Sequence, residues 1–102
     1  MVARMTPAEL AALRRTTHDA VIEGPGRVDP VLRRHVAHGQ PPSDLAVLVQ
    51  KIRDRAYTVT EADIEALRAR YSEDELFELI VAAAVGAADH RIQRALAALE
   101  DA

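Results

Sequence analysis

The sequence contains no cysteine and no tryptophan, and only Tyr57, Tyr71 and Phe77 are aromatic. Without cysteine, disulfide bonds, thiolate catalysis and metal sites with sulfur ligands are all excluded. With so few aromatic residues, the core must be built from Leu, Ile, Val and Ala. A core of that kind suits closely packed helices better than sheets.

Charge of neither sign is in large excess, because 13 Lys and Arg oppose 16 Asp and Glu for a formal net charge of −3. No basic cluster lacks nearby acids, which argues against nucleic acids and membrane surfaces as partners. The longest apolar run of low charge, residues 79–88, is too short to span a bilayer. No charged segment precedes an apolar one at the start, so no secretory signal is expected. We therefore expect a cytoplasmic protein.

Apolar residues recur at helical spacing, and no segment alternates apolar and polar residues as a strand would. The 102 residues, of which 49% are hydrophobic, fit a single domain over 1–102. We predict an all-α fold, a five-helix bundle with a long Ala-rich C-terminal helix. The expected helices cover residues 7–23, 29–38 and 43–57, a short segment after Thr60 that includes Leu67, and residues 73–100.

The ends of these helices carry recognisable capping residues. Thr6 followed by a proline, and Ser43, are each expected to cap a helix N-terminus. Thr60 with Asp63, and Ser72 with Glu75, have the spacing of capping boxes. Gly39 follows the second helix, where a left-handed residue ends many helices.

The last helix is apolar on all sides over residues 76–88, where Glu78 is the only charged side chain. We expect one stripe of this helix to face the core: Phe77, Ile80, Val81, Ala84, Ala88, Ile92, Ala95, Leu96 and Leu99. The other sides of the same turns carry Leu76, Leu79, Ala83, Val85 and Ala87. Such a helix must be covered all round. It is either the central helix of a monomer or a subunit interface, and we favour a homo-oligomer through residues 76–88.

Residues 44–99 resemble the alkylhydroperoxidase D-like, or carboxymuconolactone decarboxylase, superfamily. The resemblance is carried by Val59-Thr60 with Asp63, by the turn "YSEDE" at 71–75 that leads into the long Ala-rich helix, and by Arg91. It implies an all-α protein that forms dimers, trimers or hexamers through its helices.

The sequence also departs from that superfamily. Its peroxidase branch uses a Cys-x-x-Cys pair with a Glu and a His, so the absence of cysteine excludes thiol peroxidase activity. The usual Gly before the aromatic-Ser turn is missing, because Arg70 directly precedes Tyr71. Two functions stay open: a non-peroxidatic oligomeric helical protein of unassigned activity, and a cofactor-independent decarboxylase or lactone-type enzyme acting on a small organic acid. A small-ligand-binding module is a further alternative.

Asp89, His90 and Arg91 form the first polar cluster after the apolar run. A carboxylate, an imidazole and a guanidinium at the edge of an apolar pocket can bind an organic acid and move a proton, so these are the candidate catalytic residues. The alternative is that the helix simply re-emerges into solvent there.

Other polar groups give weaker signals. His35 and His38 share a helix face, but no carboxylate stands at ligand spacing, and we expect neither a metal nor a cofactor. The neighbours His18 and Asp19 point to different sides of a helix, and Arg53 belongs to a solvated face of mixed charge. A helix-turn-helix over residues 60–85 is rejected, because acidic residues 73–75 at the start of its second helix would repel phosphates.

Overall fold

The structure of the protein is a computed structural model that describes residues 4–101. Within that range it contains five α-helices and no strand, which confirms the predicted all-α class. The α-helices are α1 (Pro7–Glu23), α2 (Pro30–Ala37), α3 (Ala46–Arg55), α4 (Glu61–Glu65) and α5 (Glu73–Asp101). Two 3-10 turns, η1 (Ser43–Leu45) and η2 (Ala56–Thr58), flank α3.

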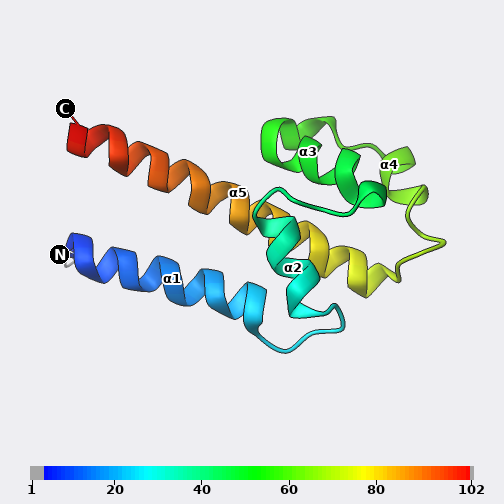
Figure 1. The fold of residues 1–102 in the computed structure, drawn as a ribbon, viewed down its shortest axis with the longest axis horizontal. Coiled ribbons are helices and arrows are strands. Elements are labelled where there is room, and N and C mark those ends of the chain that lie inside the picture. The colour runs from blue at the N-terminus through cyan, green and yellow to red at the C-terminus, as the bar shows by residue number, and fades with distance from the viewer. Residues whose placement is uncertain (1–3, 102) are drawn as a thin grey trace.

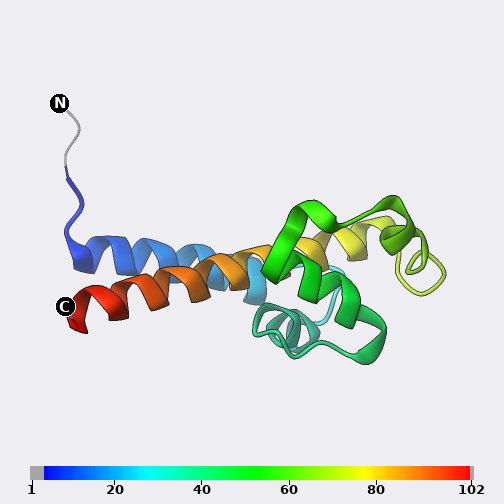
Figure 2. The ribbon, with the colours of Figure 1, turned by 90° about the horizontal axis from the view of Figure 1, so that it is seen from above.

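Helix α5 is the longest helix described, and α1, α2 and α3 all pack against it (Figure 1). Helices α2 and α3 pack on its N-terminal half, whereas α1 runs antiparallel beside it, so that both chain ends lie at one end of the molecule (Figures 1 and 2). The result is elongated, with extents of 47 × 30 × 27 Å. We call residues 28–84 the head, and residues 7–18 of α1 with residues 85–101 of α5 the arm.

Most of the predicted capping interactions are present. The hydroxyl of Thr6 accepts the Glu9 N–H at 3.1 Å. Thr60 and Asp63 form the reciprocal capping box of α4. Ser72 N–H donates to the Glu75 carboxylate at 2.9 Å while Glu75 N–H donates to the Ser72 hydroxyl at 3.1 Å. These local hydrogen bonds set where the helices begin, as the sequence predicted.

The prediction that Ser43 caps a helix over 43–57 is wrong. Ser43 is the first residue of η1, and no side-chain hydrogen bond caps that turn. The expected single helix is instead a 3-10 turn, α3 and a second 3-10 turn. The chain enters it directly from Pro42, whose extended backbone leaves Ser43 inside the first turn rather than ahead of it.

Helix α2 ends as predicted at Gly39, which has a φ of 72°. Gly39 N–H donates to the Val36 carbonyl at 3.2 Å, and Gln40 N–H donates to the His35 carbonyl at 2.8 Å. This pair of bonds is the Schellman arrangement, which favours glycine at the left-handed position. It turns the chain at Gly39 into the segment that leads to α3.

The predicted core stripe of α5 is wrong, because the opposite sides of the helix face the core. The buried residues are Leu76, Leu79, Ala82, Ala83, Gly86 and Ala87. In contrast, Phe77 is 68% exposed, and Ile92, Leu96 and Leu99 are also exposed. Periodicity could not choose between the sides of a segment that is apolar all round. The choice follows the small residues, which allow α2 to approach closely.

That approach occurs at Gly86. A Cβ on Gly86 would overlap the carbonyl oxygen of Ala37 and would lie 2.6 Å from its Cα. The backbones of α2 and α5 therefore touch directly, and only glycine fits at this position of α5. The contact fixes the end of α2 against the junction between head and arm.

Candidate functional site

Two hollows meet at the junction between head and arm. The first, the histidine cavity, has a volume of about 200 Å³ and is lined by His18, His38, Arg53, Gly86, Asp89, His90 and Gln93. The second, the arm groove, has a volume of about 320 Å³ and is lined by Leu10, Leu13, Arg14, Thr17, His18, Val85, Ala88, Asp89 and Ile92. His18 and Asp89 belong to both, so they mark the boundary between a polar hollow and an apolar one.

The histidine cavity draws its side chains from four helical segments. His18 comes from α1, His38 from the C-cap of α2, Arg53 from α3 and His90 from α5. The rings of His18 and His38 are stacked, with centroids 6.4 Å apart and planes at 16°. His18 Nδ1 also lies 3.5 Å from a carboxylate oxygen of Asp19. The turn at Gly39 and the contact at Gly86 bring these segments together.

Arg53 supplies a permanent positive charge to the cavity. Its Nη1 donates to the Ala37 carbonyl at 2.9 Å, which holds the side chain across the end of α2. Among residues 4–101, no carboxylate forms an ion pair with Arg53. The remaining guanidinium N–H groups are therefore available to a ligand or to water.

Asp89 is the acidic residue of the cavity lining, and its charge is already compensated. Arg14 Nε lies 3.0 Å from Asp89 Oδ1, and both side chains are largely buried. The other carboxylate oxygen accepts the Gln93 amide at 2.9 Å. This ion pair joins α1 to α5 across the arm. A second nitrogen of Arg14, Nη1, is buried without a hydrogen-bond partner.

The structure brings together only part of the predicted catalytic cluster. Asp89 and His90 both line the histidine cavity. Arg91 does not; its guanidinium donates to the backbone carbonyl of Arg53. His35 also lies outside the cavity lining, whereas His38 is part of it. In residues 4–101, no group of three or more acidic or histidine side chains is placed to hold a metal ion.

Sequence reasoning missed His18 and Arg53. In the sequence, His18 stands beside Asp19 alone, and Arg53 belongs to a solvated face of mixed charge. Neither belongs to a local pattern with His38 or His90, because the four residues stand on four separate helical segments. Their proximity depends on how α1, α2 and α3 pack on α5, which no spacing in the sequence encodes.

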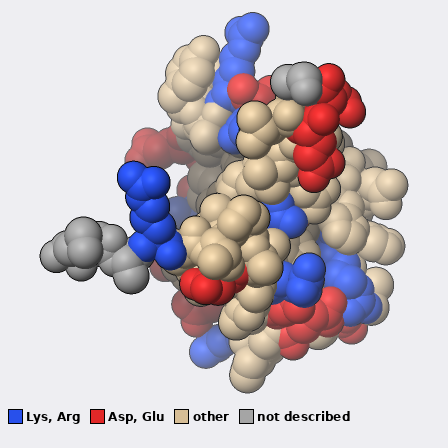
Figure 3. All heavy atoms as spheres, turned by 90° about the vertical axis from the view of Figure 1, so that its left-hand side faces the viewer, with Lys and Arg blue, Asp and Glu red and all other residues tan. Residues whose placement is uncertain are grey.

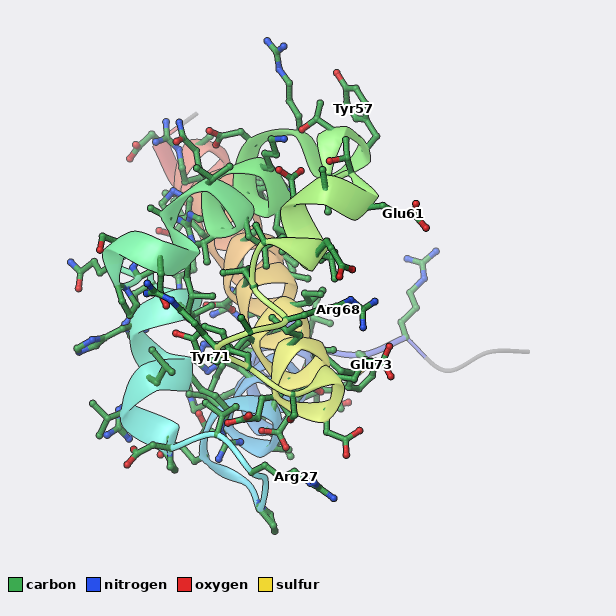
Figure 4. The ribbon with its side chains drawn as sticks, turned by 90° about the vertical axis from the view of Figure 1, so that its right-hand side faces the viewer. Arg27, Tyr57, Glu61, Arg68, Tyr71 and Glu73 are labelled. Atoms are coloured by element: carbon green, nitrogen blue, oxygen red, sulfur yellow. The ribbon has the colours of Figure 1, made fainter. Side chains whose placement is uncertain are left out.

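The opposite end of the molecule carries several exposed ion pairs. Arg68 and Glu73 lie toward one another in Figure 4, with Arg68 Nη1 3.1 Å from the Glu73 carboxylate. Arg68 Nε also lies 2.8 Å from Glu65, and Arg27 lies 3.3 Å from Asp74. Pairs between exposed side chains of this kind contribute little to stability and form a solvated surface.

Comparison of the chain with protein-family models, with curated proteins and with solved structures finds no match. The resemblance of residues 44–99 to the carboxymuconolactone decarboxylase superfamily therefore stays a prediction. Among the described helices, none combines the length and the apolar character that crossing a membrane requires.

Proposed function

We propose that this protein is a self-associating helical module, a non-peroxidatic oligomeric protein that forms a homodimer through its arm. The observation that carries the proposal is the apolar surface left open along the arm. Leu10 and Leu13 of α1 are each 52% exposed, and Ile92 and Leu96 of α5 are each 43% exposed. Exposed apolar residues gathered on one element, rather than scattered singly, mark interaction sites.

The shape of the arm suits a second copy of the same arm. Two antiparallel helices with an apolar groove between them form half of a four-helix bundle, and a two-fold axis completes it. The arm part of α5, at a rise of 1.5 Å per residue, is about 25 Å long, and two helices side by side are about 20 Å wide. Because residues 7–18 of α1 extend only about 18 Å, the footprint is about 430 Å² per copy, or roughly 860 Å² in total, close to the lower limit of roughly 1,000 Å² for a specific interface.

Charge on the arm also favours a second copy. Residues 7–18 carry Arg14 and Arg15 against Glu9, whereas residues 85–101 carry Asp89, Glu100 and Asp101 against Arg91 and Arg94. The α1 side is therefore slightly positive and the α5 side slightly negative. Seen from the end of the arm, uncharged residues lie between scattered charges of both signs (Figure 3). Placing α1 of one copy against α5 of the other therefore brings together segments of opposite net charge.

The proposed interface shifts the one expected from the sequence. Within residues 76–88, Leu76, Leu79, Ala83 and Ala87 are buried in the core of the chain itself. Only the other sides of that segment, including Val85 and Ala88 of the arm groove, can contribute to a partner contact. A charge at Ala83 would therefore test the core of one chain and not its association.

Sedimentation velocity at micromolar protein concentrations tests whether the arm mediates association. We expect the wild-type protein to sediment as a dimer. Leu13→Glu and Ile92→Glu should each weaken association by at least about tenfold, because each buries a charge in an apolar interface. Val47→Glu is the matched control, because Val47 is a 60% exposed apolar residue on α3, outside the arm. A wild-type monomer at several hundred micromolar, or equal weakening by Val47→Glu, would refute the proposal.

The enzymatic alternative, a cofactor-independent decarboxylase or lactone-type activity on a small organic acid, has less support. Asp89 is engaged by Arg14, and Arg91 by a backbone carbonyl. Of the three predicted catalytic residues, only His90 keeps a side chain without a described polar partner. We therefore propose no reaction for it.

A further inference from the structure

We propose that the histidine cavity binds a small oxyanion, a carboxylate or an inorganic anion such as sulfate, between Arg53 and the imidazoles of His18, His38 and His90. The observation behind this is the convergence of four basic side chains from four helical segments on a hollow of about 200 Å³. This inference is independent of the proposed dimer.

The charge in the cavity favours an anion. From α1, His18 faces the cavity with Asp19 and Arg14 beside it; from α2 comes His38; from α3, Arg53; and from α5, Asp89 and His90. Asp89 is neutralised by Arg14. Asp19 is not part of the cavity lining, and its side chain is 61% exposed. Among the lining residues, Arg53 is therefore the permanently charged side chain without a described ion-pair partner, and it makes the cavity positive.

The donors present match the needs of an oxyanion. A guanidinium offers planar N–H groups that bind carboxylates and tetrahedral anions through charge-assisted hydrogen bonds. Protonated imidazoles are donors at both nitrogens, and the Gln93 amide stands on the same helix as His90. The cavity is smaller than the sites that hold drug-sized ligands. An acetate- to sulfate-sized anion fits it, whereas a nucleotide does not.

The test follows the imidazole resonances of the four histidines by NMR at pH 6.0 while sulfate, acetate or chloride is added at matched ionic strength. His35 is the internal control, because it stands on α2 one turn from His38 but outside the cavity. We expect saturable shifts of His18, His38 and His90 with sulfate or acetate, and none at His35. Tighter binding of sulfate would indicate an inorganic ligand, and tighter binding of acetate would indicate an organic carboxylate.

Two variants give the second readout. Arg53→Gln and His38→Gln should each weaken the binding by about tenfold, the loss of one charge-assisted hydrogen bond. His35→Gln should leave it unchanged. Shifts at His35 equal to those at His38, an equal effect of chloride, or unchanged binding in His38→Gln would each overturn the proposal. Sedimentation reports the dimer separately, so the two proposals fail or hold independently.

Discussion

The carboxylate of Glu78 accepts the backbone N–H of Val28 at 2.7 Å, across 50 residues of sequence. Its other oxygen accepts the N–H of Arg27, also at 2.7 Å. The only charged side chain within residues 76–88 of α5 thus holds the loop between α1 and α2. These two bonds satisfy donors near the start of α2, one of them on buried Val28.

Glu78→Ala should lower the free energy of unfolding by about 2–4 kcal/mol, because it removes two hydrogen bonds to a charged acceptor. Glu78→Gln keeps one acceptor oxygen and should cost roughly half as much. Urea denaturation measures both. Glu61→Ala, an exposed first-turn acid of α4, serves as the control and should change stability by less than about 0.5 kcal/mol. Equal stability of Glu78→Ala and wild type would contradict the role assigned to this clamp.

Stability should also fall in acid because of Glu78. The N–H groups of Arg27 and then Val28 lower the pKa of Glu78 below its ordinary value of 4.5, helped by the nearby charge of Arg33. A carboxyl whose pKa is lowered by folding stabilises the protein above its unfolded pKa, and this contribution disappears as the pH drops through the folded pKa. Thermal melts between pH 7 and pH 3 should show the loss. The Glu78→Gln variant should have a flatter profile below about pH 4.5.

Asp63 contributes to the same acid sensitivity. Its pKa is lowered by hydrogen bonds from Lys51 and from Thr60. Asp63→Asn should therefore remove a separate part of the pH dependence, and the double variant should be flatter than either single variant. If the melting temperature of Glu78→Gln depended on pH as that of the wild type does, Glu78 would not be a source of the acid sensitivity.

Gly86→Ala should destabilise the protein by about 1–3 kcal/mol, because a methyl group there overlaps the backbone of Ala37. The sign of the stability change shows whether position 86 is in close contact with α2. Inside a helix free of such contacts, replacing Gly with Ala raises stability by about 1 kcal/mol. Ala84→Gly, at an exposed position of the same helix, supplies the control and should cost about 1 kcal/mol. Stabilisation by Gly86→Ala would show that α2 and α5 do not touch at this point.

The features of the fold that the sequence predicts correctly are those that depend on residues close together in the chain. Thr6, Thr60 and Ser72 cap their helices through bonds within three residues, and the sequence predicted all three. The closing turn at Gly39 was equally predictable, because its φ of 72° favours glycine.

The orientation of α5 was not predictable from its pattern. Leu76 and Phe77 are both apolar neighbours, yet one is 2% and the other 68% exposed. The choice is made by Gly86, whose missing side chain admits α2. The same holds for the candidate site: His90 stood out as a polar residue after an apolar run, but its neighbours in space, His18 and His38, come from helices that only packing brings together.

Because α5 is a single helix of 29 residues shared by head and arm, the two parts have no hinge between them. The hydrogen-exchange rates of the backbone amides of α5 should therefore increase gradually with distance from the head. Those near Ala82 and Ala83, which are fully buried, should exchange only on global unfolding, and those beyond Leu96 should exchange by fraying. A partner bound to the arm would move the point where fraying begins toward the C-terminus. The exchange rates of individual amides in the arm would therefore show whether a partner is bound.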